Sequence, residues 1–192
     1  MLVNGHADPS PSNFSSIKCG SMRWWAKREA AAACPFCLLA QNLPAGGTST
    51  LLYQSSRLGL RYSNGLLQVT MNDEDEKVVA FQDRNPSAYR HYLVIPKEHI
   101  PTVKQLCKGE EHYALVQHML KTGDTLMHRD APAAVEYRFG FHRPPFNSVN
   151  HLHLHCMALP FHSRWRAFKY LPLGRWGGYI DANELLQKLD VG

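Results

Sequence analysis

The chain is 192 residues long, which suits one domain with a loose terminal segment. Hydrophobic residues make up 44% of it, enough for a buried core. No apolar run reaches the roughly 20 residues of a membrane-spanning helix, so the composition excludes a spanning protein. The formal charge of +5 favours anionic partners such as phosphates or nucleic acid.

Five cysteines are present, and two of them stand as Cys34-x-x-Cys37. An odd number in this arrangement is not typical of a disulfide framework, so we expect a reduced compartment, the cytoplasm or the nucleus. Residues 1–33 are rich in Ser, Pro and Ala. That composition predicts a disordered leader, and an organelle-targeting transit peptide is the alternative.

In chain order, the first expected element is a short apolar helix that begins near Cys34 and ends at the Pro-Ala-Gly-Gly sequence of 44–47. Strands are predicted at 51–53 and 77–81. Between them, residues 55–72 form an insertion with an Asn-Gly turn signal, and we assign no role to it.

A further strand is predicted at 91–95, and an amphipathic helix runs from about 110 to 128. Strands follow at 137–141 and from 151 to about 158, where Pro160 closes the last one. Asp181 is positioned to cap a C-terminal helix. The sequence therefore predicts an α+β domain over 34–192, with a meandering antiparallel sheet, one long packing helix and short terminal helices.

Residues 151–155 read His-Leu-His-Leu-His. Side chains two residues apart on a strand share a face, so His151, His153 and His155 line one side while the leucines point into the core. A solvated surface strand and a three-histidine metal site are the alternatives. Neutral imidazole is a good nucleophile near neutral pH, and the middle ring has a partner on each side. The pattern favours attack by His153 on phosphorus.

These residues resemble the histidine-triad (HIT) superfamily, whose signature is His-φ-His-φ-His-φ-φ with φ an apolar residue. The similarity extends through 81–83, 90–100 and 140–148, and it covers about 34–54 and 73–190. Within the superfamily, the chain is most similar to the Hint branch, and there to plant proteins of the third and fourth type, described as acting on adenosine phosphosulfate.

The resemblance implies a HIT-like fold and a hydrolase or transferase that cleaves adenylyl–X bonds of the phosphoramidate or adenosine phosphosulfate type. His153 would be the nucleophile and form a nucleotidyl-histidine, which water later releases. His155 would contact the phosphate and assist the leaving group. Ser148 would hydrogen-bond near the leaving atom, and His91 would be a fourth histidine on the adjacent strand.

The same resemblance implies the contacts of a small nucleotide substrate. Asp83 would accept from the ribose hydroxyls, and Phe81 would flank the base. The loop that carries Asn147 and Ser148 would contact the phosphate together with His153 and His155.

The Cys34-x-x-Cys37 spacing fits half of a zinc site, and it fits a redox pair equally well. In cysteine-bearing members of the superfamily, such a pair holds zinc with two histidines. The resemblance therefore implies structural zinc, and no organic cofactor, at Cys34, Cys37, His99 and His151.

Two other classes of function remain open. Cations and aromatics interleave at 164–170, and this basic-aromatic C-terminal arm is typical of single-strand nucleic-acid binders. No separate zinc-finger domain follows, so nucleic acid is the less favoured partner. The other class is a protein that binds nucleotides with little or no catalysis. A homodimer also remains open, because the 143–148 loop differs from that of the first Hint branch.

Overall fold

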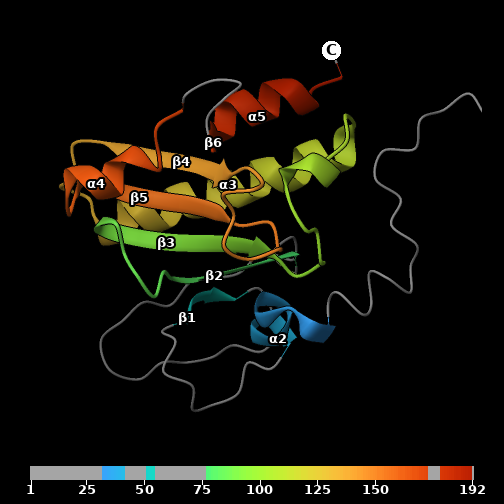
Figure 1. Cartoon of the computed structure of the whole chain (residues 1–192), viewed down its shortest axis with the longest axis horizontal. Helices are drawn as coiled ribbons and strands as arrows, with labels where there is room; N and C mark the ends of the chain where they lie inside the picture. Colours follow the sequence, from blue (N-terminus) through green and yellow to red (C-terminus); the bar gives the residue numbers. More distant parts are fainter. Residues whose placement is uncertain (1–31, 42–50, 55–76, 173–177, 192) are drawn as a thin grey trace, which may run out of the picture.

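The computed structural model describes residues 32–41, 51–54, 77–172 and 178–191. The predictions for the 55–72 insertion and for nearly all of the leader lie outside these ranges. In the described part, one antiparallel sheet has helices on both faces (Figure 1). No helix there is both long and apolar enough to cross a membrane.

In chain order the elements are α2 (Pro35–Gln41), β1 (Leu51–Gln54), β2 (Val78–Gln82), β3 (Ala88–Pro96), a 3-10 turn (Val103–Gln105), α3 (Glu110–Asp130), β4 (Tyr137–His142), β5 (Leu154–Phe161), α4 (Arg164–Phe168), β6 (Tyr179–Asp181) and α5 (Ala182–Leu189). The strand order in the sheet is β1-β2-β3-β5-β4-β6. The chain thus meanders except that β5 returns between β3 and β4. This order places the triad strand inside the sheet, with a paired neighbour on each side.

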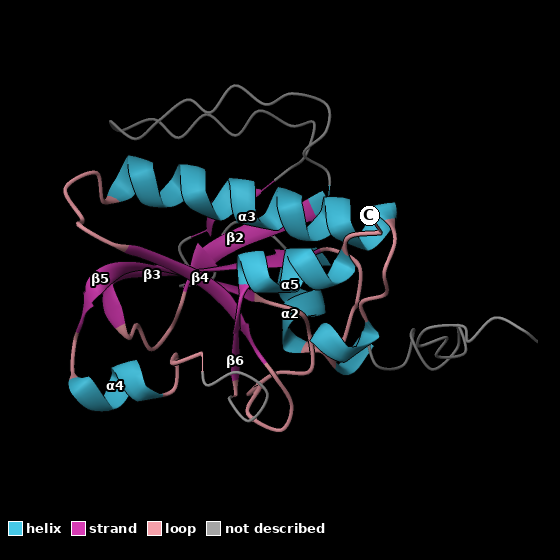
Figure 2. Ribbon diagram, turned by 90° about the horizontal axis from the view of Figure 1, so that it is seen from above, coloured by secondary structure: helices cyan, strands magenta, loops and turns pink. Residues whose placement is uncertain are grey.

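One face of the sheet is packed against α3 and forms the main core (Figure 2). The buried residues of α3 recur at three- and four-residue steps, as the amphipathic pattern predicts. They form one cluster with Leu152, Leu154 and Cys156 of the triad segment. Helix and strand approach closely at Gly123, where a Cβ atom would collide with the Cys156 sulfur.

The opposite face, called the histidine face below, is covered by two short segments (Figure 2). On one side, Phe36 and Leu39 of α2 pack on Phe81 in β2 and its neighbours in β3. On the other side, Tyr170, which follows α4, packs against Met157 and Tyr179. The triad histidines lie between the two covers.

Strand β3 begins three residues earlier than predicted, at Ala88, and both ends of β5 also differ from the sequence expectation. Strand β5 begins at Leu154 rather than at residue 151, because the preceding segment bonds to a loop: the Leu152 N–H donates to the Ile100 carbonyl at 2.6 Å. The alternation still holds there, since Leu152 lies in the core cluster. Pro160 does not close the strand, because a register shift against β3 lets Phe161 pair with Ala88 beyond it.

Candidate active site

The ring of His153 is 6% exposed and lies just before β5. Its Nδ1 is 2.6 Å from the carbonyl oxygen of His151. A carbonyl can only accept, so Nδ1 carries the proton and Nε2 keeps its lone pair. Burial lowers the pKa of His153, which keeps the ring neutral near pH 7. No described residue hydrogen-bonds to Nε2. His153 is therefore an oriented, neutral nucleophile.

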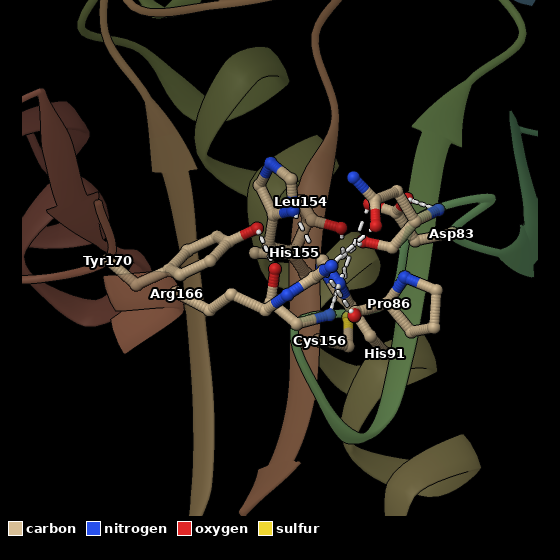
Figure 3. A network of polar contacts seen from close by, with 10 residues as sticks. Asp83, Pro86, His91, Leu154, His155, Cys156, Arg166 and Tyr170 are labelled. Carbon is tan, nitrogen blue, oxygen red and sulfur yellow. Dashed lines mark hydrogen bonds and ion pairs between the residues drawn. The ribbon is translucent and has the colours of Figure 1, made fainter. Parts of the chain in front are cut away.

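A chain of hydrogen bonds fixes the proton of the next ring. The Ser87 N–H donates to His91 Nδ1 at 3.1 Å, which leaves the His91 proton on Nε2. That atom lies 2.8 Å from His155 Nδ1 and donates to it (Figure 3). The proton of His155 must then sit on Nε2, which is buried and has no partner in the described part of the chain. The ring centroids of His153 and His155 are 5.0 Å apart, so a nucleophile and a proton donor stand side by side.

Burial keeps this pair of rings neutral. It lowers the pKa of His91 to about 4 and that of His155 well below its ordinary value, and neighbouring histidines lower the pKa of His155 further. Asp83 opposes the shift at His91, since its Oδ2 is 3.5 Å from His91 Nδ1. The other oxygen of Asp83 accepts from the Asn85 N–H at 2.8 Å. Asp83 thus stands beside His91, and its contact with a ribose stays a prediction.

The loop between β4 and β5 brings one of its two predicted residues to the triad. Asn147 lines a small cavity together with His153, and its side-chain amide donates to Asn150 Oδ1 at 2.8 Å. Ser148 is exposed and makes no hydrogen bond within the described residues. A contact between Ser148 and a leaving group therefore stays a prediction. Phe81 is buried beneath α2 at a ring-centroid distance of 5.4 Å from Phe36.

Three aromatic neighbours of the triad are absent from the sequence prediction. Phe36 lies edge-on to His153 at 5.5 Å between ring centroids. Its position between the two cysteines is a usable signal, because a metal site that gathers the cysteines would bring Phe36 along. His142 lies 4.7 Å from His155, and Tyr170 lies 5.3 Å from it. Strand alternation from Gly140 could have pointed to His142, whereas no sequence signal points to Tyr170.

The basic-aromatic arm divides into an anchored and an outward part. Arg166 donates to the Pro86 carbonyl at 2.7 Å and to Asn85 Oδ1 at 2.8 Å (Figure 3). The Tyr170 hydroxyl is 3.2 Å from Ser87 Oγ. These contacts tie the arm to the turn that precedes His91. Trp165 and Phe168 point outward, at 89% and 65% exposed.

Cys34, Cys37, His99 and His151 form a buried group beside the triad, and their ligand atoms all lie within 4.8 Å of one another. The His151 Nε2 donates to the Pro96 carbonyl at 2.9 Å, so its Nδ1 is free of a proton. That nitrogen is 3.5 Å from the Cys34 sulfur and 3.4 Å from the Cys37 sulfur. Such a group can hold a metal ion, and it does not include His153.

The cysteine pair has the free thiols that this arrangement requires. Burial and the neighbouring Cys34 raise the pKa of Cys37 to about 12, so a cation is needed to hold it as a thiolate. Cys156 is a third free thiol, buried in the core. Cys107 is disulfide-bonded, and the reduced compartment stays a prediction.

Comparison with known proteins agrees with this geometry. The model of the family described as "Scavenger mRNA decapping enzyme C-term binding" matches residues 64–170, more than half of the chain. The bifunctional adenosine 5'-phosphosulfate phosphorylase/adenylylsulfatase HINT4 of Arabidopsis thaliana is 62% identical over 60% of this chain and 78% of its own. The adenosine 5'-monophosphoramidase HINT3 of Xenopus tropicalis is 39% identical over 61% and 75%.

Among solved structures, a HIT family hydrolase from Legionella pneumophila Philadelphia 1 is 26% identical, covers 65% of this chain and 90% of that chain, and has a TM-score of 0.47. The family match and the two Hint relatives, each covered over more than two thirds of its length, agree with the histidine motif. This chain belongs to the histidine-triad (HIT) family.

Proposed function

We propose that this protein cleaves adenylyl–X bonds through a nucleotidyl intermediate on His153, with X a sulfate or an amine. One observation carries the proposal: the ring of His153, with a lone pair on Nε2, lies 5.0 Å between centroids from the ring of His155, with an unpaired donor on Nε2. The names of the relatives in Arabidopsis and Xenopus support the two leaving groups. The substrate is a small adenylyl nucleotide.

The positions of the protons on His153 and His155 define the two steps of the reaction. His153 Nε2 attacks the α-phosphorus, and the P–X bond breaks as the P–N bond forms. An amine leaving group takes the proton of His155 Nε2, whereas sulfate departs as an anion and needs none. Water then attacks the same phosphorus, releases AMP and returns the electron pair to His153; where an amine took the proton of His155, a proton from this water replaces it. Asp83, Phe81, Asn147 and Ser148 would hold the ribose, the base and the phosphate.

We propose structural zinc as the ion of the Cys34, Cys37, His99 and His151 group. Tetrahedral zinc with two sulfur and two nitrogen ligands separates its ligand atoms by about 3.5 Å. The sulfur–nitrogen distances here are 3.2 to 3.5 Å, which fits that geometry. The Pro96 carbonyl orients His151, as a second partner does for most metal-bound histidines. Zinc would fasten α2 beside the triad and leave His153 free.

The proposal predicts that His153 becomes labelled during turnover. The protein is mixed with adenosine phosphosulfate that carries 32P at the α-phosphorus, quenched in alkali because the P–N bond is acid-labile, and mapped for the labelled residue. We expect about one label per chain on His153, and none in His153→Asn. Turnover in His153→Asn should fall at least about 10³-fold, since the nucleophile is lost.

His128→Asn is the matched control, because His128 is 59% exposed on α3, on the other face of the sheet. It should label and turn over like the wild type. Normal turnover in a folded His153→Asn protein would remove the covalent mechanism. Nucleotide binding without label or turnover, over both donor types, would instead support a binding protein.

A further inference from the structure

His142 stands at the end of β4, on the histidine face, and has no role in the steps above. Its Nδ1 is 3.3 Å from the Gly178 carbonyl oxygen. The carbonyl accepts, so the proton sits on Nδ1 and the lone pair on Nε2. No described residue hydrogen-bonds to that Nε2. His142 therefore offers the site an unused acceptor.

Ring contacts locate His142 relative to the triad. The His142 and His155 centroids are 4.7 Å apart, and those of His155 and His153 are 5.0 Å apart. His142 and His153 also line the same small cavity. In-line attack requires the incoming nucleophile to approach phosphorus from the side away from His153. A base that stands on another strand and lines the same cavity as His153 suits that approach.

The chemistry of one atom on each of these neighbouring rings selects the molecule that would bridge the rings. His155 Nε2 is an unpaired donor and His142 Nε2 is an unused acceptor. A bare phosphate oxygen could satisfy the donor only. Water can accept from His155 and donate to His142 at once, because it has both lone pairs and protons.

Resting on the proposed function, we propose that His142 is the general base of the second step, which releases the nucleotide from His153. The water oxygen attacks the phosphorus of nucleotidyl-His153 while one water proton moves to His142 Nε2. The P–N bond breaks, and its electron pair returns to His153 Nε2. AMP leaves, and His142 passes the proton to solvent.

The other groups of the histidine face are not available as the general base of this step. His91 uses both ring nitrogens, one with Ser87 and one with His155. After sulfate has left, His155 still carries its Nε2 proton and cannot accept another there. Asp83 lies on the far side of His91, at its Nδ1. Burial lowers the pKa of His142 to about 4, against the opposing hydrogen bond to Gly178, so its Nε2 is unprotonated at pH 7.

Two substitutions of His142 distinguish a general base from a residue that only positions the nucleotide. In His142→Asn, the side-chain amide can still donate to the Gly178 carbonyl but removes the basic nitrogen. In His142→Gln, the amide oxygen reaches toward the Nε2 position and can accept a hydrogen bond but cannot take a proton. Melting temperature and bound metal are compared with the wild type to show that each variant is folded.

The experiment follows the two steps separately by rapid quench with adenosine phosphosulfate, whose sulfate needs no proton to leave. Both variants should label His153 within about 3-fold of the wild-type rate. Release of AMP should slow by about 10²- to 10³-fold, so labelled protein accumulates. Fluoride, which has no proton to lose, should restore release in both variants by attacking phosphorus to form the adenosine phosphorofluoridate.

The possible failures are distinguishable. No label on wild-type His153 would remove the proposed function and this inference together. Normal labelling with unchanged AMP release in either folded variant would remove the inference alone. Equal slowing of both steps, or full recovery in His142→Gln, would also overturn it, since His142 would then only position the nucleotide.

Discussion

Backbone groups determine which ring nitrogen carries the proton in three histidines of the site. The His151 carbonyl holds the proton of His153 on Nδ1, and the Gly178 carbonyl does the same for His142. The Ser87 N–H donates to Nδ1 of His91, so the His91 proton lies on Nε2. That Nε2–H donates to Nδ1 of His155, so the His155 proton also lies on Nε2. Backbone groups do not change protonation with pH, so a nucleophile, a donor and an acceptor are defined before substrate binds.

The donor at His155 leads to a prediction about leaving groups. In His155→Gln, the amide can hydrogen-bond but cannot give up its proton. We expect kcat/KM for an adenosine phosphoramidate to fall by about 10²- to 10⁴-fold, because the amine must be protonated as it leaves. The loss for adenosine phosphosulfate should be at least 10-fold smaller, since sulfate leaves unprotonated.

Steady-state rates with the two donors, which share the adenylyl half, measure this difference. His128→Asn should leave both rates unchanged. An equal loss for the two donors would show that His155 stabilises phosphate charge without donating a proton.

At the residue scale, the sequence predicted which histidines form the site better than it predicted the role of each one. Strand alternation correctly placed His153 and His155 on one face, opposite Leu154. It could not reveal which ring nitrogen carries each proton, because alternation gives the face of a side chain and not its hydrogen-bond partners. Alternation from Gly140 also points to His142, but its proton position depends on Gly178, 36 residues away.

At the scale of elements, α2 has few contacts other than those of its cysteines that hold it on the sheet. It is seven residues long, too short to be stable as an isolated helix. Phe36 and Leu39 pack on the sheet, and the four-residue metal group joins the helix to the segment before β5. The same helix supplies Phe36 against His153, so its attachment bears on catalysis.

Removing one residue of the proposed zinc site should therefore affect both stability and the active site. We expect Cys37→Ser to lose the metal and several °C of melting temperature, and to slow labelling of His153 as Phe36 moves away. Metal analysis, a melting curve and the rapid-quench assay check these outcomes. Cys156→Ala is the matched control, because it removes a buried thiol outside the metal group and should keep the metal. A wild-type protein without bound metal would refute the zinc site.

The longer elements were predictable from the sequence, and the shortest were not. The 21-residue α3 repeats its apolar spacing over several turns, so its period is plain. β6 has three residues and α4 has five, which is too few to show a period. The start of β5 was misplaced because residues 151–153 keep the alternation of a strand while bonding to a loop.

Across the whole molecule, the histidine face concentrates buried neutral imidazoles. Burial lowers the pKa of His91 and of His142 to about 4. In the unfolded chain, each would titrate near 6.5. The stability that depends on their neutrality is complete above pH 6.5, and it is lost as the pH falls toward 4, because only the unfolded state then binds the protons.

We therefore expect the free energy of unfolding to fall by about 1.4 kcal/mol per pH unit for each such histidine between pH 6.5 and 4. The groups facing His91 are Asp83, Lys169, His142, His153 and His155. Denaturant unfolding across this range measures the slope, and His142→Asn should make it shallower. A Cys37→Ser background separates this effect from acid loss of the metal. A flat profile in that background would contradict the prediction.

The α+β class was predictable from the number and spacing of strands, but the strand order was not. The insertion of β5 between β3 and β4 depends on pairing between segments far apart in sequence, such as His155 with both Leu93 and Gly140. A local pattern contains no information about such partners. The spatial grouping of His91, His142 and His155 follows from that order.

The two covers of the histidine face come from α2, before the first strand, and from Tyr170, after β5. As the chain leaves the ribosome, residues 151–155 emerge ahead of Tyr170. Until that residue emerges, His142 and His155 lack a wall that shields them from bulk water. The cover that Tyr170 provides can therefore form only after residues 151–155 have emerged.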